Sequence, residues 1–431
     1  MTSESKKLPV GFGRLWTAQT VSSLGDGVSH AALPLLALTL TRDPIALAVI
    51  TAAGTLPWLL FGILGGALVD RWDRRRTMWV TDAVRAVLLA VPAGAAVLDL
   101  LSVPLLATTA FLLGLGGLFF DTAATAYLPD LLGRDPAVLE RANSRLRSAQ
   151  TAASGFAGPP AGSALLALGR AVPLLADALS FAVSAALVRS LPPVPRPLPE
   201  ARESLLRQAR AGASHVFRDR LLLGLALRPA VGNVAFLALE TVLALFAHER
   251  LGIGAFGFGL LLTAEAAGGL LGAGLASFLG RRLGTGTALT CTAALEGFAI
   301  LLLAAAPGPY VAGLALALCG AGVGATMVLA PSLRQAVVPA HLMGRVASTS
   351  RMLSMCAAPF GAFLGGWLAT AYDVRTPLYA AAFLLLAMTA VTSTMTGNRR
   401  VEAALRAAAA TTAPTTSAPT TDPAPVPQPT A

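Results

Sequence analysis

Residues 65–76 read GGALVDRWDRRR and form a strongly basic turn between two apolar stretches. The apolar stretches, 45–69 and 78–98, are each long enough to cross a hydrocarbon layer of about 30 Å, which takes about 20 helical residues. Four arginines and two aspartates cannot lie in lipid, and arginine-rich short loops stay on the cytoplasmic side of a membrane. We therefore expect this turn to join two membrane spans on the cytoplasmic face.

The composition of the whole chain is typical of a helical membrane protein with many spans. Of its 431 residues, 55% are hydrophobic and 13% are charged, whereas about a quarter are charged in soluble domains. Stretches such as 100–118 are apolar on every face, so they do not alternate as the strands of a membrane barrel do. The net charge of +10 is spread between apolar stretches. We therefore expect no nucleic-acid partner.

Apolar length and polar breaks predict an all-α fold of twelve transmembrane helices. The first six are expected near 15–40, 45–69, 78–99, 103–128, 145–168 and 171–191. The second six are expected near 221–247, 255–279, 286–306, 309–333, 346–371 and 375–396. The predicted units are a cytoplasmic N-terminus (1–14), an N-terminal bundle (15–191), a cytoplasmic linker (192–220), a C-terminal bundle (221–396) and a disordered cytoplasmic tail (397–431).

The basic residues predict the orientation of this arrangement. With twelve spans, both termini, the linker and the basic turns lie on one side of the membrane, together with nearly all of the 32 Lys and Arg residues. The opposite side holds only Arg42, Arg170, Arg250 and Arg375. Because basic short loops stay inside, we expect both termini in the cytoplasm and the chain in the inner (plasma) membrane.

A weak internal repeat relates the two groups of helices. Laying the first half on the second aligns Arg141 with Arg345 and Gly162 with Gly366. Parallel repeats of six spans are found in transporters whose two bundles rock about a central site. The linker between the groups could carry a short amphipathic helix on the inner leaflet, or it could be a solvated spacer.

The basic turn resembles the signature turn of the major facilitator superfamily. That turn runs Gly, three residues, Asp, Arg, any residue, Gly and two basic residues, and the matching residues here are Gly66, Asp70, Arg71, Arg74 and Arg75. Asp73 stands in place of the second glycine. The opening LWTAQTVSSLGD at 15–26 is similar to the transmembrane secretion effectors, a branch that includes macrolide efflux proteins and the enterobactin exporter. The resemblance implies two pseudo-symmetric bundles of six helices.

The resemblance also implies that the turn is a latch between the bundles. Asp70 can accept hydrogen bonds from the N-terminus of a neighbouring helix, and Gly66 lets that helix approach closely. In the family the neighbour is the eleventh helix, which here starts near Gly344 and Arg345. The alternative is that the arginines only fix the topology and face anionic lipid head groups.

A second likeness lies in the fifth span, which is similar to the glycine- and proline-containing helix of antiporters. The matching residues are Gly155, Gly158, Pro159 and Gly162. Ser154 and Ser163 stand where the family usually has glycine. The likeness favours export by proton antiport, and the alternative is ordinary close packing of helices.

Ionisable residues inside the spans are candidates for binding protons or a cationic substrate. An ionised carboxylate at the centre of a membrane helix costs about 3 kcal/mol on insertion scales, so it must face a wet cavity, pair or stay protonated. Asp26 lies within the first span, with His30 one turn later on the same face. The family fold lines its cavity with helices 1, 4, 7 and 10, which adds Asp121 and Glu240. Asp26 could instead bond to backbone in a distorted helix.

Four other ionisable residues are expected to be structural. The family places helices 8 and 9 away from the centre of the cavity, so we expect Glu265 and Glu296 to form structural pairs. Asp177 is interpreted in the same way. Arg228, near the inner end of the seventh span, is expected to extend its charge to the membrane surface.

The sequence therefore predicts a secondary transporter that exports a drug-like, siderophore-like or secondary-metabolite molecule in exchange for protons. The alternatives are a proton-independent facilitator or importer of the same fold, or a non-transporting membrane sensor or assembly partner. The chain has no phosphate-binding loop and no metal-ligand spacing, so we expect no enzymatic activity, no cofactor and no metal. The expected partners are the substrate, protons and membrane lipids, and the chain is expected to act as a monomer.

Overall fold

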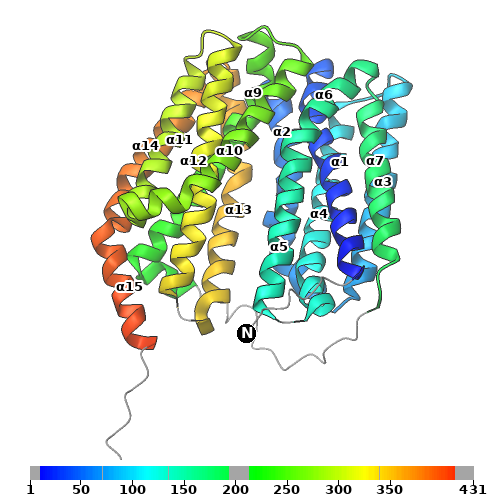
Figure 1. Ribbon diagram of the computed structural model, residues 1–431. Helices are drawn as coiled ribbons and strands as arrows, with labels where there is room; N and C mark the ends of the chain where they lie inside the picture. Colours follow the sequence, from blue (N-terminus) through cyan, green and yellow to red (C-terminus); the bar gives the residue numbers. More distant parts are fainter. Residues whose placement is uncertain (1–9, 70, 134, 194–212, 339, 413–431) are drawn as a thin grey trace, which may run out of the picture.

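The computed structural model describes residues 10–69, 71–133, 135–193, 213–338 and 340–412, and these residues form an all-helical molecule without strands (Figure 1). Ten helices within these ranges are long and apolar enough to cross a membrane. The predicted helical membrane fold is thereby confirmed. The expected spans 15–40 and 145–168 are not among the ten, so the total of twelve stays a prediction.

The helices form two bundles that lie side by side (Figure 1). The first half contains α1 (Val10–Leu40), α2 (Pro44–Val69), α3 (Arg74–Val97), α4 (Val103–Leu132), α5 (Pro136–Gln150), the π-helix η1 (Thr151–Ala157), α6 (Gly158–Leu168) and α7 (Val172–Arg189). The second half contains α9 (Arg220–Glu249), α10 (Ala255–Leu283), α11 (Thr285–Ala304), α12 (Pro309–Val337), α13 (Ala340–Ala371) and α14 (Thr376–Thr396). The last helix, α15 (Asn398–Thr412), follows the second half.

The expected span 145–168 consists of three pieces, the end of α5, then η1 and α6. Pro159 and Pro160 lie at the start of α6. Prolines have no N–H group to donate to the preceding turn, and the wider π register lies directly before them. The break therefore coincides with the residues that cannot complete a regular α-helical ladder.

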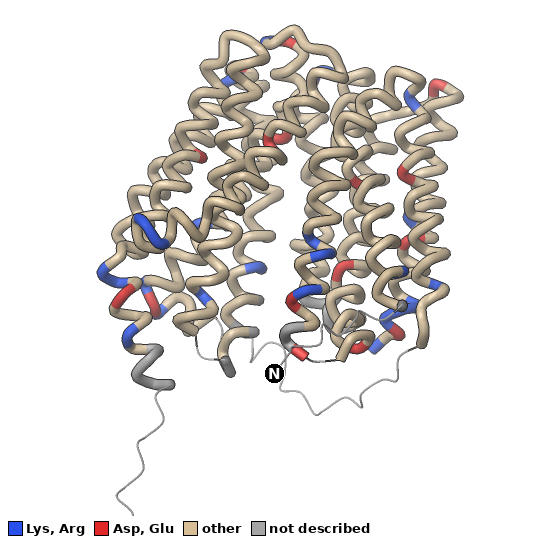
Figure 2. The backbone as a smooth tube through the Cα atoms, viewed as in Figure 1, with Lys and Arg blue, Asp and Glu red and all other residues tan. Residues whose placement is uncertain are grey.

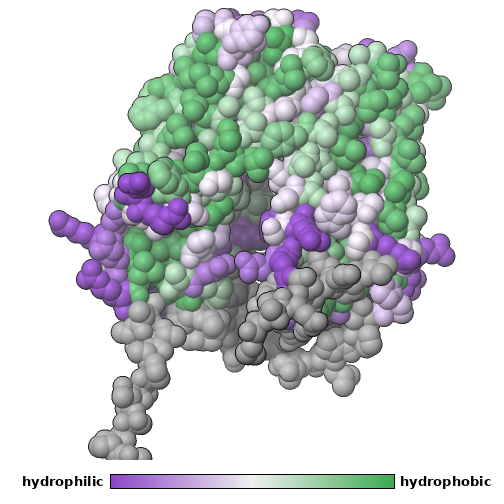
Figure 3. Space-filling view, viewed as in Figure 1, coloured by the Kyte–Doolittle hydropathy of each residue, from purple (hydrophilic) through white to green (hydrophobic). Residues whose placement is uncertain are grey.

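The turns between helices define two sides of the molecule. The linker side holds the start of α1, the turn between α2 and α3, and α15, and the far side is the opposite end. Figure 2 shows most of the Lys and Arg residues of the described part in the portion toward the linker side. In Figure 3 the surface is hollowed between the two halves toward that same side. The cleft between the halves therefore opens to the linker side.

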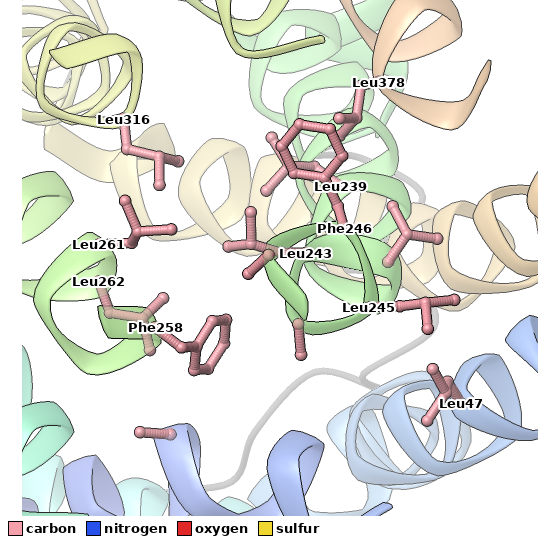
Figure 4. Close-up of a cluster of buried hydrophobic side chains, with 14 of the residues drawn as sticks. Leu47, Leu239, Leu243, Leu245, Phe246, Phe258, Leu261, Leu262, Leu316 and Leu378 are labelled. Atoms are coloured by element: carbon pink, nitrogen blue, oxygen red, sulfur yellow. The ribbon is translucent and has the colours of Figure 1, made fainter. Parts of the chain in front are cut away.

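The far side is closed by a large cluster of buried hydrophobic side chains (Figure 4). Leu47 of α2 belongs to the same cluster as Leu245 and Phe246 of α9 and Phe258 of α10. Lipid tails are as apolar as these side chains, so close packing rather than removal from lipid holds the helices together. The cluster thus joins the two halves at one end only.

Small residues bring the helices of the second half into direct backbone contact. A Cβ atom added at Gly268 or Gly272 of α10 would overlap the carbonyl oxygen of Ala317 or Ala321 of α12. Such positions let two membrane helices approach closely enough for extensive van der Waals contact. The α10–α12 pair is therefore a rigid unit that depends on glycine.

The helix α15 corrects the predicted disordered tail at 397–431. Residues 398–412 are helical, because the segment is rich in alanine and arginine, which favour helix, and because its first residue is anchored. The Asn398 side chain donates to the carbonyl oxygen of Leu283 at 2.8 Å and accepts from the N–H group of Thr287 at 2.9 Å. Val401 is buried against the second half. Residues 413–431 lie outside the described part.

We expect Gly272→Val to lower the free energy of unfolding by about 1–3 kcal/mol, because the side chain has no room beside α12. The matched control is Gly274→Val on the same helix, where no atom lies within 4 Å of an added Cβ. Thermal unfolding of the two purified variants in detergent checks this. Equal melting temperatures for both variants would contradict the packing described for α10 and α12.

Candidate functional site

The arginines of the basic turn hold it to the first half of the molecule. Arg74 forms an ion pair with Asp130 of α4 and donates to the carbonyl oxygen of Ala126 at 3.1 Å. Arg75 donates to the backbone oxygen of Arg189 at the end of α7. The turn is thus fixed to two neighbouring helices of its own bundle.

Asp73, which replaces the family's second glycine, begins helix α3. Its backbone is extended, with φ −68° and ψ 116°, and its carboxylate accepts from the N–H group of Arg76 at 2.6 Å. Aspartate at this position satisfies one of the free N–H groups at a helix start. The turn therefore needs no glycine here.

The predicted latch between the halves is only partly within the described residues. Arg71 is exposed, and Asp70 lies outside the described part. Gly66 lies in α2, and Gly344 and Arg345 lie in α13, but the surroundings of these three residues are also outside it. The latch stays a prediction.

The glycine- and proline-containing segment packs against helices of both halves. A Cβ at Gly158 would lie 2.6 Å from the backbone of Gly27 in α1, and Gly162 lies against Val28. On the other side, a Cβ at Gly155 would lie 2.9 Å from the Ala266 side chain of α10. This segment is in close helix packing, part of it between the halves.

Asp26 projects from α1 and pairs with a buried arginine of α3. The Nη2 atom of Arg85 lies 2.9 Å from Oδ1 of Asp26. The side chain of Asp26 is 46% exposed and that of Arg85 is 9% exposed. The guanidinium carbon also lies 3.7 Å from the centre of the Phe181 ring of α7. Asp26 therefore bonds to a charged side chain, and the expected alternative of a backbone contact is not needed.

Asp177 of α7 lies behind Asp26 and is held by hydroxyl groups. Its carboxylate accepts from Ser29 of α1 and from Ser180 at 3.1 Å. A Cβ at Gly25 would clash with both Asp177 and Ser180. Glycine at this position lets α1 approach α7 and places Ser29 on the carboxylate.

His30 and Glu240 connect the two halves inside a cavity. Nδ1 of His30 in α1 lies 3.4 Å from Oε1 of Glu240 in α9. Both side chains line a cavity of about 220 Å³ at the closed end of the cleft, with mainly apolar neighbours such as Leu33, Leu47 and Ile50. The cavity therefore combines an apolar wall with one acidic and one basic group.

Asp121 of α4 is exposed and faces the same region. It interacts electrostatically with Asp26 and Arg85 of its own half and with Arg351 of α13 in the other half. The Arg351 guanidinium lies 4.8 Å from the centre of the Trp58 ring of α2. The structure thus brings all four predicted candidates, Asp26, His30, Asp121 and Glu240, to the cleft between the halves.

A further ion pair fastens the far side of the second half. Arg250, after α9, pairs with Asp373 in the turn between α13 and α14. Partial burial alone would raise the pKa of Asp373, but hydrogen bonds from Arg250 and from backbone N–H groups lower it below its ordinary value. The stabilisation by this pair is therefore present at neutral pH and is lost as the pH falls through that lowered pKa.

Residues 9–422 match the family model described as transmembrane secretion effector. The chain belongs to this family of major facilitator transporters. It is 29% identical over 392 residues to the multidrug efflux pump Tap of Mycolicibacterium fortuitum, covering 87% of this chain and 93% of Tap. It is 30% identical to the uncharacterized MFS-type transporter y4rN of Sinorhizobium fredii, and the match covers 89% of this chain and 93% of y4rN.

Solved structures agree with this secretion-effector fold. A bacterial homologue of the iron transporter ferroportin, in an inward-facing state, superposes with a TM-score of 0.73 at 17% identity, covering 91% of this chain and 100% of the homologue. The nucleoside transporter NupG superposes with a TM-score of 0.69 at 13% identity, and the match covers 90% of this chain and 99% of NupG. At such identities the likeness shows the fold alone.

Two charged residues of this transporter were assigned wrongly from the sequence. Arg228 does not reach the membrane surface, because it donates to Thr326 at 2.9 Å and lies 3.7 Å from Glu296. Glu265 forms no hydrogen bond or ion pair among the described residues and interacts electrostatically with Glu240. Glu296 is paired, as expected.

Two buried residues of α3, Asp82 and Arg85, were missed altogether. Arg85 was not considered as a site residue, although it lies well inside an apolar span. The signal was present, because an acidic and a basic residue three positions apart lie on one face of a helix. An ionisable residue inside a membrane span is a candidate functional residue by default. Applying this rule to α3 would have identified Asp82 and Arg85.

We expect Asp73→Ala to lower the free energy of unfolding of this transporter by about 1 kcal/mol, because the first turn of α3 loses its cap. Asp73→Asn keeps an oxygen that can accept the same bond and is the control. Melting temperatures of both variants in detergent test this. A loss of stability in the asparagine variant equal to that of the alanine variant would show that charge, not capping, matters at this position.

Proposed function

We propose that this secretion-effector transporter exports an amphipathic small molecule in exchange for protons. The relatives named multidrug efflux pump Tap support export of drug-like compounds. The cavity supports the amphipathic character, because most of its wall is apolar and its ionisable groups are His30 and Glu240. The coupling of two bundles around one central site is typical of this class of secondary transporter.

The observation that carries this proposal is the contact between His30 and Glu240. The two residues come from different halves, and their atoms lie 3.4 Å apart at the closed end of the cleft. An alternating movement of the halves has to break this contact. A proton on His30 or Glu240, or a cationic group of a substrate near Glu240, changes its strength, so binding is linked to the movement.

We further propose that the linker side faces the cytoplasm. The concentration of basic residues on that side supports this orientation. The structure would then correspond to a state open to the cytoplasm, ready to take up substrate for export. Both termini would be cytoplasmic, the transporter would act as a monomer among inner-membrane lipids, and the basic turn would latch the halves in the opposite state.

The first test is transport in everted membrane vesicles containing the protein. We expect an amphipathic cation such as ethidium to accumulate inside vesicles with an acidic interior, and we expect Glu240→Gln to reduce the initial rate at least about tenfold. A tenfold change corresponds to about 1.4 kcal/mol, which is within the range for one lost ionic contact. Fluorescence quenching of the dye gives the rate.

The matched control is Glu249→Gln, which removes an exposed carboxylate at the end of the same helix α9. It should transport as the unmodified protein does. Transport that does not depend on the pH gradient would favour the alternative of a proton-independent facilitator. Equal rates in the Glu240 and Glu249 variants would remove Glu240 from the mechanism.

A second test addresses the movement of the halves. A Cβ at Gly259 of α10 would lie 3.1 Å from the Cβ of Ser163 and 2.8 Å from the carbonyl oxygen of Pro159, both in α6. A disulfide, with its Cβ atoms about 3.5–4.5 Å apart, therefore fits here after a small outward shift of α10. We expect the Ser163→Cys/Gly259→Cys double variant, in a background without the three native cysteines, to lose transport on oxidation and to regain it on reduction.

The two single-cysteine variants are the controls and should be insensitive to oxidation. Full transport by the cross-linked double variant would contradict separation of α6 from α10 during the cycle. Cross-linking is followed independently by the mobility of the protein on a gel, so failure to form the disulfide is distinguished from lack of effect.

A further inference from the structure

Asp82 is a carboxylate enclosed within the first half of the protein. Its side chain is 0% exposed, neither carboxylate oxygen has a hydrogen-bond partner, and the hydroxyl of Ser184 in α7, which lies close to it, is also without a partner. The nearest cationic group is on Arg85 of the same helix, whose Nη1 atom lies 3.5 Å from Oδ1 of Asp82. An ionised carboxylate without hydrogen bonds is strongly unfavourable inside a protein. Asp82 therefore requires either the full charge of Arg85 or a proton.

Arg85 does not give Asp82 its full charge, because it is shared with Asp26. Its shorter contact, 2.9 Å, is with Asp26. The Phe181 ring lies against the guanidinium, and the Nε atom of Arg85 has no hydrogen-bond partner. One positive charge thus serves two carboxylates that differ in access, since Asp26 is 46% exposed and Asp82 is enclosed.

The other charged groups around this trio do not supply the missing charge. Asp177 of α7 adds a carboxyl group, although hydroxyls of Ser29 and Ser180 bond to it. Asp121 of α4 faces Arg351 of α13 across the cleft, and His30 of α1 faces Glu240 of α9. Asp26, Asp82 and Arg85 are therefore short of one positive charge, which a single proton provides.

We propose that Asp26 and Asp82 alternate in holding one proton, and that Arg85 pairs with whichever of the two carboxylates is ionised. In one arrangement Asp82 holds the proton and Arg85 pairs with Asp26. In the other, the proton is on Asp26, where it can exchange with the cleft, and Arg85 pairs with Asp82. The proton leaves one carboxyl oxygen and binds the other, so the number of protons and the total charge stay the same.

The consequence is that one proton has an accessible and an enclosed position within the same bundle. Arg85 links α1 to α3 only in the arrangement in which Asp82 is protonated. Breaking that link removes one of the contacts that hold the part of α1 carrying His30, one turn beyond Asp26, and so changes the contact with Glu240. This role in coupling rests on the proposed export function, whereas the sharing of the proton does not.

The test is infrared spectroscopy of the purified protein in lipid vesicles at pH 7.5, without substrate. The spectrum of each variant is subtracted from that of the unmodified protein. We expect Asp82→Asn to remove one carboxylic-acid C=O band that shifts in D₂O. We also expect Asp26→Asn to remove the same band, although Asp82 is still present, because Arg85 then pairs fully with Asp82 and Asp82 gives up its proton. A purely structural role of Asp26 would not move a band of Asp82.

Asp99→Asn is the matched control, since Asp99 is 85% exposed in a turn and pairs with Arg170. The spectrum of Asp99→Asn should keep the band. A further variant, Asp177→Asn, identifies any signal from the carboxyl group of Asp177, which lies close to Asp26. Persistence of every carboxylic-acid band in Asp82→Asn would overturn the proposal, as would an unchanged band in Asp26→Asn. The Asp26 variant keeps the proposal testable if the Asp82 variant does not fold. If these bands behave as expected but the vesicles show no transport, the proposed export function is overturned and the sharing of the proton is not.

Discussion

Charge compensation without water is the constraint on which the rest of this structure depends. The hydrocarbon core offers no solvent to a charged side chain, so each ionisable group must find a partner within the protein, face a water-filled cavity or stay uncharged. Arg85 meets Asp26 and Asp82, and Arg228 meets Glu296. The Asp26–Arg85 and Arg228–Glu296 pairs each connect two helices of one bundle that pack mainly against other helices of that bundle. The contact of His30 with Glu240 applies the same constraint between the bundles.

The two halves satisfy this constraint differently. In the second half, Arg228 and Glu296 carry one charge each, and Thr292 and Thr326 complete the hydrogen bonds. That network is neutral and complete. In the first half, Arg85 stands between two carboxylates, so its network has a deficit. This difference gives the Asp26–Arg85–Asp82 network of the first bundle an electrostatic reason to bind a proton, in addition to the carboxyl groups of Glu240 and Glu265 in the second bundle.

The sequence predicted well those features that local composition determines. Spans follow from apolar length, and the basic turn after α2 and the candidates on α1, α4 and α9 follow from charges placed in apolar surroundings. Pairing could not be predicted in this way, because Asp26 and Arg85 are distant in the chain and meet only after α1 and α3 have both packed against α7. Arg228 was misassigned for the same reason, and α15 was missed because its anchor, Asn398, bonds to a distant turn.

The π-helix η1 between α5 and α6 has a geometric consequence for the fifth span. Each π-turn accommodates one residue more than an α-turn, and one residue corresponds to about 100° of rotation around a helix axis. A helical wheel drawn from Gly162 back to Arg141 therefore assigns the wrong face to α5. Alignments of this span with relatives that lack the bulge need a one-residue gap near Thr151–Ala157, and without it each residue of α5 would be assigned to a face about 100° away from its own.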